Sequence, residues 1–220
     1  MSTTSPTPAP AAPMPETSRL MNVIVEPAAT FQDLPRASRW WSPWLVVSAA
    51  GLIFVVLLNQ KIGFEQVAEN QIALSGRADQ FEKLPPDQRQ AALARSVTFT
   101  RVFSYGSPFT LLIAYLITAG VLAGIFNGAM GAGIKFPVML SIVTYAGLVH
   151  LIGTALAIVI LEAGVHADRY NVANPSGTNL AYYMDPMATG KFLYGMLSID
   201  AISVWSVVLM GAGVAPRSAR

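Results

Sequence analysis

The chain has 220 residues, of which 53% are hydrophobic and only 12% are charged. A soluble globular domain carries about 25% charged residues, so this composition indicates an integral membrane protein. The formal net charge of +2, with no stretch that mixes basic and aromatic residues, argues against a nucleic-acid partner. The absence of cysteine excludes disulfides, thiolate nucleophiles and sulfur-ligated metals.

The composition of residues 1–20 predicts a disordered tail. The segment is rich in Pro, Ala, Ser and Thr, and it lacks the basic start and the apolar run of a signal peptide. Such a composition buries too little apolar surface to offset the entropy of ordering. A membrane domain is expected over residues 21–216, and we expect it to begin with a short interfacial helix near Pro27.

Four apolar segments are candidates for crossing a bilayer, which takes about 20 residues. They are residues 44–59, 109–126, 136–163 and 192–215. Trp40, Trp41 and Trp44 accompany the first segment and are expected to anchor it at a membrane surface. The third segment would be about 40 Å long as a helix, against an apolar core of about 30 Å. It must therefore tilt, bend near Gly147 or Gly153, or protrude.

The segment between the first two spans, residues 60–107, is polar. Its apolar residues recur at roughly helical spacing on both sides of Pro85 and Pro86. The spacing predicts a helical hairpin that extends spans one and two outside the membrane, and a partly ordered loop is the alternative. The predicted fold class is all-α, a polytopic transmembrane helical bundle with a helical insertion between spans one and two.

An even number of spans places both termini on the same side of the membrane. Basic residues close to span ends mark the cytoplasmic side, and here they include Arg36, Arg39, Arg217 and Arg220. We therefore expect both termini in the cytoplasm and the insertion on the opposite side.

Asp200 is the residue that most strongly suggests a site, because a carboxylate inside a membrane costs a few kcal/mol. It could mark a functional or packing site within the last span, or it could cap a helix that starts late. His150 is the one histidine within a predicted span. It could pair with Asp200 in a proton relay or be hydrogen-bonded within the core. His150 and Thr154 are the expected hydrogen-bond donors to Asp200.

Gly120, Gly124 and Gly128 are spaced four residues apart in and just beyond the second span. Small residues at this spacing let helix backbones approach closely in lipid. The pattern predicts helix packing, either inside the bundle or between two copies of the chain. No nucleophile with a base, pair of catalytic carboxylates or cluster of metal ligands is visible, so we expect no enzyme activity, no metal and no cofactor.

Several stretches resemble the Yip family, membrane proteins named for their interaction with Ypt/Rab GTPases. The stretches are residues 26–31 (EPAATF), 39–43 (RWWSP), 126–128 (FNG), 135–136 (KF) and 199–205 (IDAISVW). The motif positions within them are Pro27, Phe31, Asn127, Gly128, Lys135, Asp200 and Trp205. Together they bracket nearly the whole chain, from about residue 22 to residue 215.

The resemblance implies a polytopic membrane domain that is usually drawn with five spans, so four or five are expected here. Eukaryotic relatives act in vesicle trafficking and bind Rab-type GTPases through an N-terminal cytosolic region, which the short tail of this chain does not support. Bacterial members resemble it better, which implies the bacterial inner membrane.

The expected function is a non-catalytic membrane scaffold or protein-interaction domain, linked to membrane organisation or trafficking. Its partners would be the lipid bilayer and either another membrane protein or further copies of the chain. The alternative is a small transporter or channel component that uses Asp200 and His150.

Overall fold

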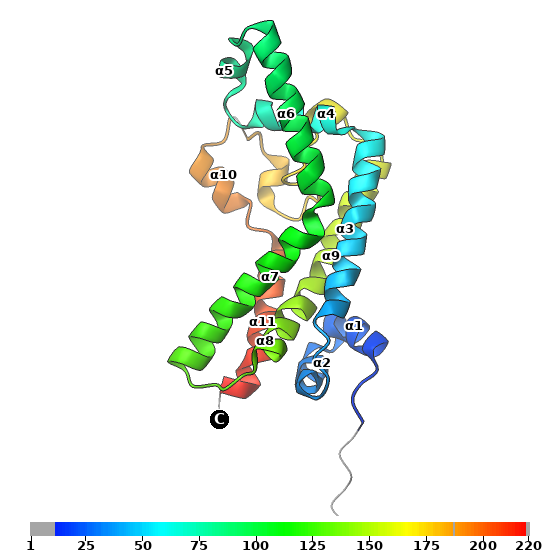
Figure 1. Cartoon of the computed structure of the whole chain (residues 1–220), viewed down its shortest axis with the longest axis vertical. Helices are drawn as coiled ribbons and strands as arrows, with labels where there is room; N and C mark the ends of the chain where they lie inside the picture. Colours follow the sequence, from blue (N-terminus) through cyan, green and yellow to red (C-terminus); the bar gives the residue numbers. More distant parts are fainter. Residues whose placement is uncertain (1–11, 187, 219–220) are drawn as a thin grey trace, which may run out of the picture.

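The computed structural model describes residues 12–186 and 188–218, and this part of the chain is helical, without a β-strand (Figure 1). The α-helices are α1 (Glu16–Val25), α2 (Pro27–Asp33), α3 (Trp41–Lys61), α4 (Phe64–Leu74), α5 (Ala78–Glu82), α6 (Pro86–Tyr105), α7 (Ser107–Ala123), α8 (Phe136–Ala146), α9 (His150–Glu162), α10 (Lys191–Leu197) and α11 (Ala201–Ser218). Short helical turns are η1 (Leu34–Arg36), the π-helical η2 (Gly124–Ala129), η3 (Gly147–Val149), η4 (Ala167–Arg169) and η5 (Leu180–Tyr183).

Three described helical segments are long and apolar enough to cross a membrane: Trp41–Lys61, Ser107–Ala129 and Phe136–Glu162. They contain the first three segments predicted from the sequence almost completely. The fourth predicted segment is not one continuous helix, because α10 and α11 meet at an angle of 57°. Counting this bent pair as one span gives four.

The third segment forms the centre of the bundle. Every residue from Val138 to Val149 is buried, and the segment packs against α3, α7 and α11. The sequence left open whether this segment tilts, bends near Gly147 or Gly153, or protrudes; the structure shows a 3₁₀ turn, η3, that begins at Gly147 between α8 and α9. A Cβ added to Gly147 would lie 2.2 Å from Tyr115 Oη of α7. Gly147 therefore lets α7 approach the central helix closely.

The predicted packing role of Gly120, Gly124 and Gly128 inside the bundle is wrong. All three lie on an exposed face of α7 and η2, and within the described part of the chain a Cβ added to any of them would meet no atom of another element within 4 Å. Sequence spacing places residues on one face of a helix but does not say which way that face turns. Gly147 and Gly213 make the close contacts instead. A contact of the three glycines with another molecule stays a prediction.

A buried charge joins the N-terminal helices to each other, and a tyrosine of α8 joins them to the bundle. Arg19 is only 1% exposed; its Nε donates to Asp33 Oδ2 at 2.8 Å and its Nη1 donates to the Ala37 carbonyl at 2.7 Å. The Tyr145 hydroxyl of α8 donates to Glu16. Burying a charge is tolerated when it is paired and hydrogen-bonded in this way.

This docking changes the predicted boundary of the tail. Residues 16–20, predicted to be disordered, belong to α1, while residues 1–11 lie outside the described part. Helix α2 begins at Pro27, where the sequence predicted a helix start. Asp33 and Ala37, the partners of Arg19, are distant from it in sequence, so no local pattern indicates these contacts.

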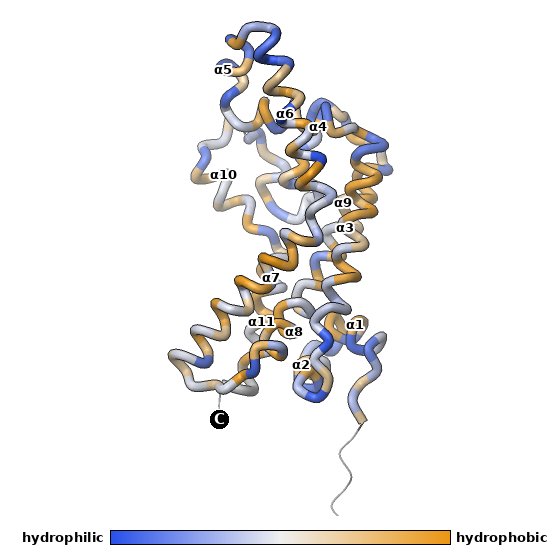
Figure 2. The backbone as a smooth tube through the Cα atoms, viewed as in Figure 1, coloured by the Kyte–Doolittle hydropathy of each residue, from blue (hydrophilic) through white to orange (hydrophobic). Residues whose placement is uncertain are grey.

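Helices α1 and α2, the end of α11 and the connection between α7 and α8 lie at one end of the molecule (Figure 1). Helices α4 and α5, with the beginning of α6, lie at the other end, where hydrophilic residues gather (Figure 2). The Lys61 ammonium bonds Glu162 Oε2 at 2.8 Å and joins the ends of α3 and α9 there. The cytoplasmic location of the termini stays a prediction.

Candidate functional site: two polar cavities beside a broken helix

The first cavity, here called the central cavity, lies halfway along the spanning helices. It has a volume of about 340 Å³, and its walls include Gly51, His150, Thr154 and Asp200. Gly51 is ten residues from both ends of α3, which corresponds to about 15 Å in either direction. Irregular backbone at such a depth is tolerated where it is buried in protein or lines a water-filled cavity.

Asp200 caps helix α11. Its Oδ1 accepts hydrogen bonds from the backbone N–H groups of Ile202 at 2.8 Å and Ser203 at 3.1 Å. Its other oxygen accepts from the Thr178 hydroxyl. The capping interpretation of Asp200 therefore describes its contacts, although the carboxylate is half-buried in the central cavity rather than free at the surface.

His150 and Thr154 line the same cavity but do not bond to Asp200, so the predicted donors were wrong. The His150 Nδ1 lies 3.1 Å from the Gly147 carbonyl. Because a carbonyl only accepts, this contact assigns a proton to Nδ1. The Thr154 hydroxyl donates to the His150 carbonyl at 3.1 Å. Both side chains are thus tied to the backbone of their own segment.

The donor to Asp200 comes from a loop that folds back against α9 and α11. The Asn174 and Asn179 amides bond each other reciprocally, at 3.0 and 2.7 Å, and close this loop. The Ala201 N–H then donates to the Thr178 carbonyl at 3.3 Å. The sequence showed only a polar connection with turn residues here, and no local signal indicates which hydroxyl meets Asp200.

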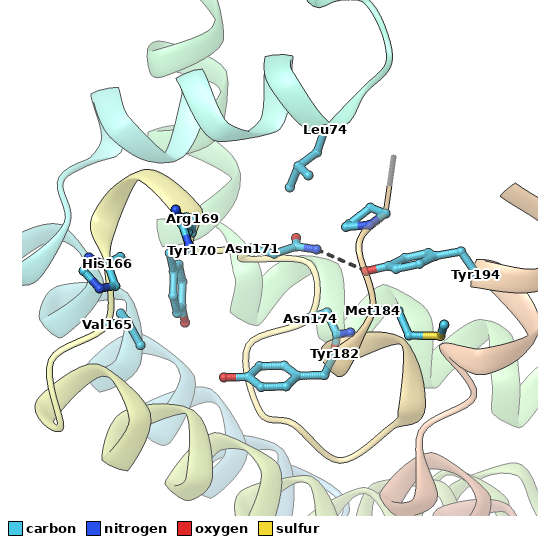
Figure 3. A pocket seen from close by; sticks show the side chains of 11 residues that line it. Leu74, Val165, His166, Arg169, Tyr170, Asn171, Asn174, Tyr182, Met184 and Tyr194 are labelled. Atoms are coloured by element: carbon cyan, nitrogen blue, oxygen red, sulfur yellow. Dashed lines mark hydrogen bonds between the residues drawn. The ribbon is translucent and has the colours of Figure 1, made fainter. Parts of the chain in front are cut away.

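The second cavity, here called the outer cavity, lies beyond the ends of α3 and α9 (Figure 3). Its volume is about 370 Å³, and Tyr170, Tyr182 and Tyr194 are among its walls. Asn174 lines both cavities and so separates them. Helix α4 fixes one wall, because the buried Asn70 amide donates to the carbonyls of Ala167 at 2.7 Å and Tyr170 at 3.0 Å.

Tyr170 is unusual among the side chains of the outer cavity. It is 6% exposed, and its hydroxyl has no hydrogen-bond partner among the described residues. Burial raises the pKa of the Tyr170 phenol, which keeps its hydroxyl protonated. Figure 3 shows Tyr182 pointing toward Tyr170, and it shows Tyr194 from α10, whose hydroxyl accepts from the Asn171 amide at 3.5 Å. The sequence analysis did not identify this cavity.

The described residues around the two cavities show neither a metal-binding cluster nor an activated nucleophile. Within the described part of the chain, no three His, Asp or Glu side chains are placed to hold a metal ion together. Among the described residues that line either cavity, no hydroxyl bonds to a histidine side chain, as an activated nucleophile would.

The tryptophans at the start of α3 have different surroundings. Trp44 donates its indole N–H to the Pro108 carbonyl at 3.0 Å and so joins α3 to the start of α7. Trp40 lies beside it, with 6.5 Å between the ring centroids, whereas Trp41 is 47% exposed. Trp41 therefore offers the most surface for the predicted anchoring at the membrane interface.

Several positions that carry the family resemblance have local structural roles. Phe31 is buried beside Gly213, while Trp205 lies on the exposed side of α11. The Asn127 amide bonds the backbone N–H and carbonyl of Ile134, both at 2.8 Å, and closes the loop that contains Gly128. Lys135 immediately precedes α8 and is exposed.

Comparison with models of known protein families supports the resemblance that these positions indicate. The family model of the Yip1 domain matches residues 21–217. Searches of curated proteins and of solved structures found no match. Because the match covers nearly the whole chain, and because the fold contains several apolar helices of spanning length, the chain belongs to the Yip1-domain family of integral membrane proteins.

Proposed function

We propose that this protein is a non-catalytic membrane scaffold that holds a spanning helix of another membrane protein against α7. The observation that carries this proposal is the high exposure of the apolar surface of α7. Only 6% of its apolar window is buried, compared with 33% for α3 and 50% for the central segment. The helix therefore offers far more surface than the other two spans.

The exposed face of α7 has the features of a helix-binding surface. Ile117, Gly120 and Gly124 are spaced three and four residues apart and share one face of the helix. Glycine in a helix costs about 1 kcal/mol relative to alanine. Apart from the helix's own backbone and the neighbouring residues, no atom of the described residues lies within 4 Å of an added Cβ at Gly120 or Gly124, so packing among these residues does not account for this cost. Close approach of a second helix would account for the cost of these glycines.

The alternative, a small transporter or channel component, has weaker support. Asp200 and His150 do share the central cavity, which such a function requires. The bonds of Asp200, however, go to the start of α11 and to Thr178, and the bond of His150 goes to the Gly147 carbonyl. These contacts hold the broken helix together and favour a structural role for both side chains.

The scaffold would act in the bacterial inner membrane with both termini in the cytoplasm, linked to membrane organisation or trafficking. Helices α4 to α6 would then project on the opposite side. Helix α1 packs on α2 and on the central segment of the bundle, and a Rab-type GTPase is not part of this proposal.

The experiment is site-specific photocrosslinking in native membranes. A photoreactive residue replaces Ile117 on α7, and in a matched control it replaces Ile53, which is similarly exposed on α3. The proposal expects a discrete protein adduct from position 117 and none from position 53. An adduct of twice the chain mass would identify a second copy as the occupant. Lipid adducts alone from position 117 would contradict the scaffold function.

A further inference from the structure

The outer cavity lies where α3 and α9 end. The ion pair between Lys61 and Glu162 joins the ends of α3 and α9, and the wall of the cavity begins three residues later at Val165. Charged pairs are costly inside the apolar core, so this level corresponds to the headgroup layer of a bilayer.

Helix α10 places the cavity beside lipid. It contributes Tyr194 to the wall and exposes Phe192, which is 84% accessible, together with Leu193 and Met196. Apolar side chains exposed on a short helix at a membrane surface are covered by lipid. A ligand of the outer cavity is therefore available from the membrane itself.

The wall is rich in hydrogen-bond donors. The buried Tyr170 hydroxyl has no partner among the described residues, and the Tyr194 hydroxyl accepts one bond, so both have a proton to donate. Arg169 is the one permanent charge among the described lining residues, and none of these residues is a carboxylate. A ligand that supplies several acceptor oxygens and a negative charge fits this set.

Nearby acidic side chains leave this cation available. Asp168 lies 3.9 Å from the Arg169 guanidinium, and both side chains are largely exposed, so the pair is weak in water. Asp185 precedes the lining residue Pro186, and its Oδ1 accepts from the Ala188 N–H at 3.3 Å. Arginine binds a phosphate through paired, charge-assisted hydrogen bonds, which are stronger than an exposed ion pair.

We propose that the outer cavity binds the phosphate-bearing headgroup of a membrane phospholipid. Tyr170, Tyr194 and Arg169 donate to the phosphate oxygens, and the apolar part of the wall, Leu74, Val165 and Met184, contacts the first methylene groups of the lipid. This site goes beyond the scaffold function and does not rest on it, since α7 plays no part in the cavity.

The test uses the full chain in detergent and three probes added below their micelle-forming concentrations. These are dihexanoyl phosphatidylglycerol, dihexanoylglycerol without a phosphate, and inorganic phosphate. Calorimetry measures the dissociation constant of each probe for the natural chain, Tyr170→Phe, Arg169→Gln and the control Tyr105→Phe. Tyr105 is exposed on α6, away from the cavity, and Tyr170→Phe removes only a hydroxyl that has no partner in the fold.

The dissociation constant of the phospholipid should be the same for the natural chain and for Tyr105→Phe. It should be about tenfold higher for Tyr170→Phe and for Arg169→Gln. Thermal unfolding of each variant shows that the fold is kept. An affinity for dihexanoylglycerol equal to that for the phospholipid, or an unchanged phospholipid affinity in either cavity variant, would overturn the proposal. Binding of inorganic phosphate as tight as that of the phospholipid would overturn the lipid source and identify a soluble phosphate instead.

Discussion

Replacing Asp200 tests how the broken helix is held in the membrane. Asp200→Asn keeps an acceptor for the Ile202 and Ser203 N–H groups, because asparagine caps helices about as well as aspartate. Its amide could also still pair with the Thr178 hydroxyl. Asp200→Leu removes the cap and one of the two hydrogen-bond partners of the Thr178 hydroxyl, which also lies 3.0 Å from Ser176 Oγ.

The magnitudes favour a clear loss of stability in Asp200→Leu. Removing the carboxylate recovers an insertion cost of about 3 kcal/mol. It also removes three hydrogen bonds to a charged acceptor, two of which form the helix cap, and each contributes about 1.5–3 kcal/mol. We expect a net loss of about 1.5–6 kcal/mol, or about 3–24 °C in Tm for a chain of this length.

The assay is thermal unfolding in detergent followed by far-UV circular dichroism, combined with a double-mutant cycle. Thr178→Val should be non-additive with Asp200→Leu by about 1 kcal/mol, because the two side chains bond each other. Thr154→Val is the matched control, since Thr154 lines the same cavity but bonds the His150 carbonyl. Equal Tm values for the Leu and Asn variants, or additivity with Thr178→Val, would refute the capping account.

Further outcomes follow from packing, buried charge and topology. Gly147→Ala should lower Tm by a few degrees, because overpacking against Tyr115 costs about 1–3 kcal/mol. Gly124→Leu should leave the Tm of the isolated chain unchanged. A larger fall in Tm for Gly124→Leu than for Gly147→Ala would contradict the orientation of α7. Arg19→Met should lower the free energy of unfolding by about 3–5 kcal/mol, because it leaves Asp33 buried without its main partner. A free energy of unfolding that chemical denaturation finds nearly unchanged would contradict the role of this buried ion pair. Reporter fusions at the two termini should report the cytoplasm for both, and opposite sides would contradict the topology.

The sequence predicted those parts of the fold that depend on local patterns. The apolar runs identified the spanning helices, and Pro27 and Gly147 marked a helix start and an irregularity, because hydropathy and backbone restrictions act within a few residues. The orientation of the glycine face of α7 was not predictable, since it depends on how α7 packs on the rest of the bundle.

The contents of the candidate site were predictable only in part. The sequence singled out Asp200, His150 and Thr154, and the structure brings all three to one cavity. The Thr178 partner of Asp200 lies in a loop that is 22 residues away in sequence, which no residue pattern specifies. The buried pair of Arg19 and Asp33 was missed for the same physical reason, because isolated charges near a span resemble surface charges until their partners are known.

The most direct test of the scaffold function is the dependence of the crosslink from position 117 on the glycine face. Gly124→Leu places a large side chain on that face, and Gly211→Leu does the same on an exposed, equally open face of α11. The scaffold account predicts that the protein adduct falls at least tenfold in Gly124→Leu and is unchanged in Gly211→Leu, while both variants keep the Tm of the natural chain. An adduct of equal yield in both variants would contradict the claim that α7 binds a partner helix through its open glycine face.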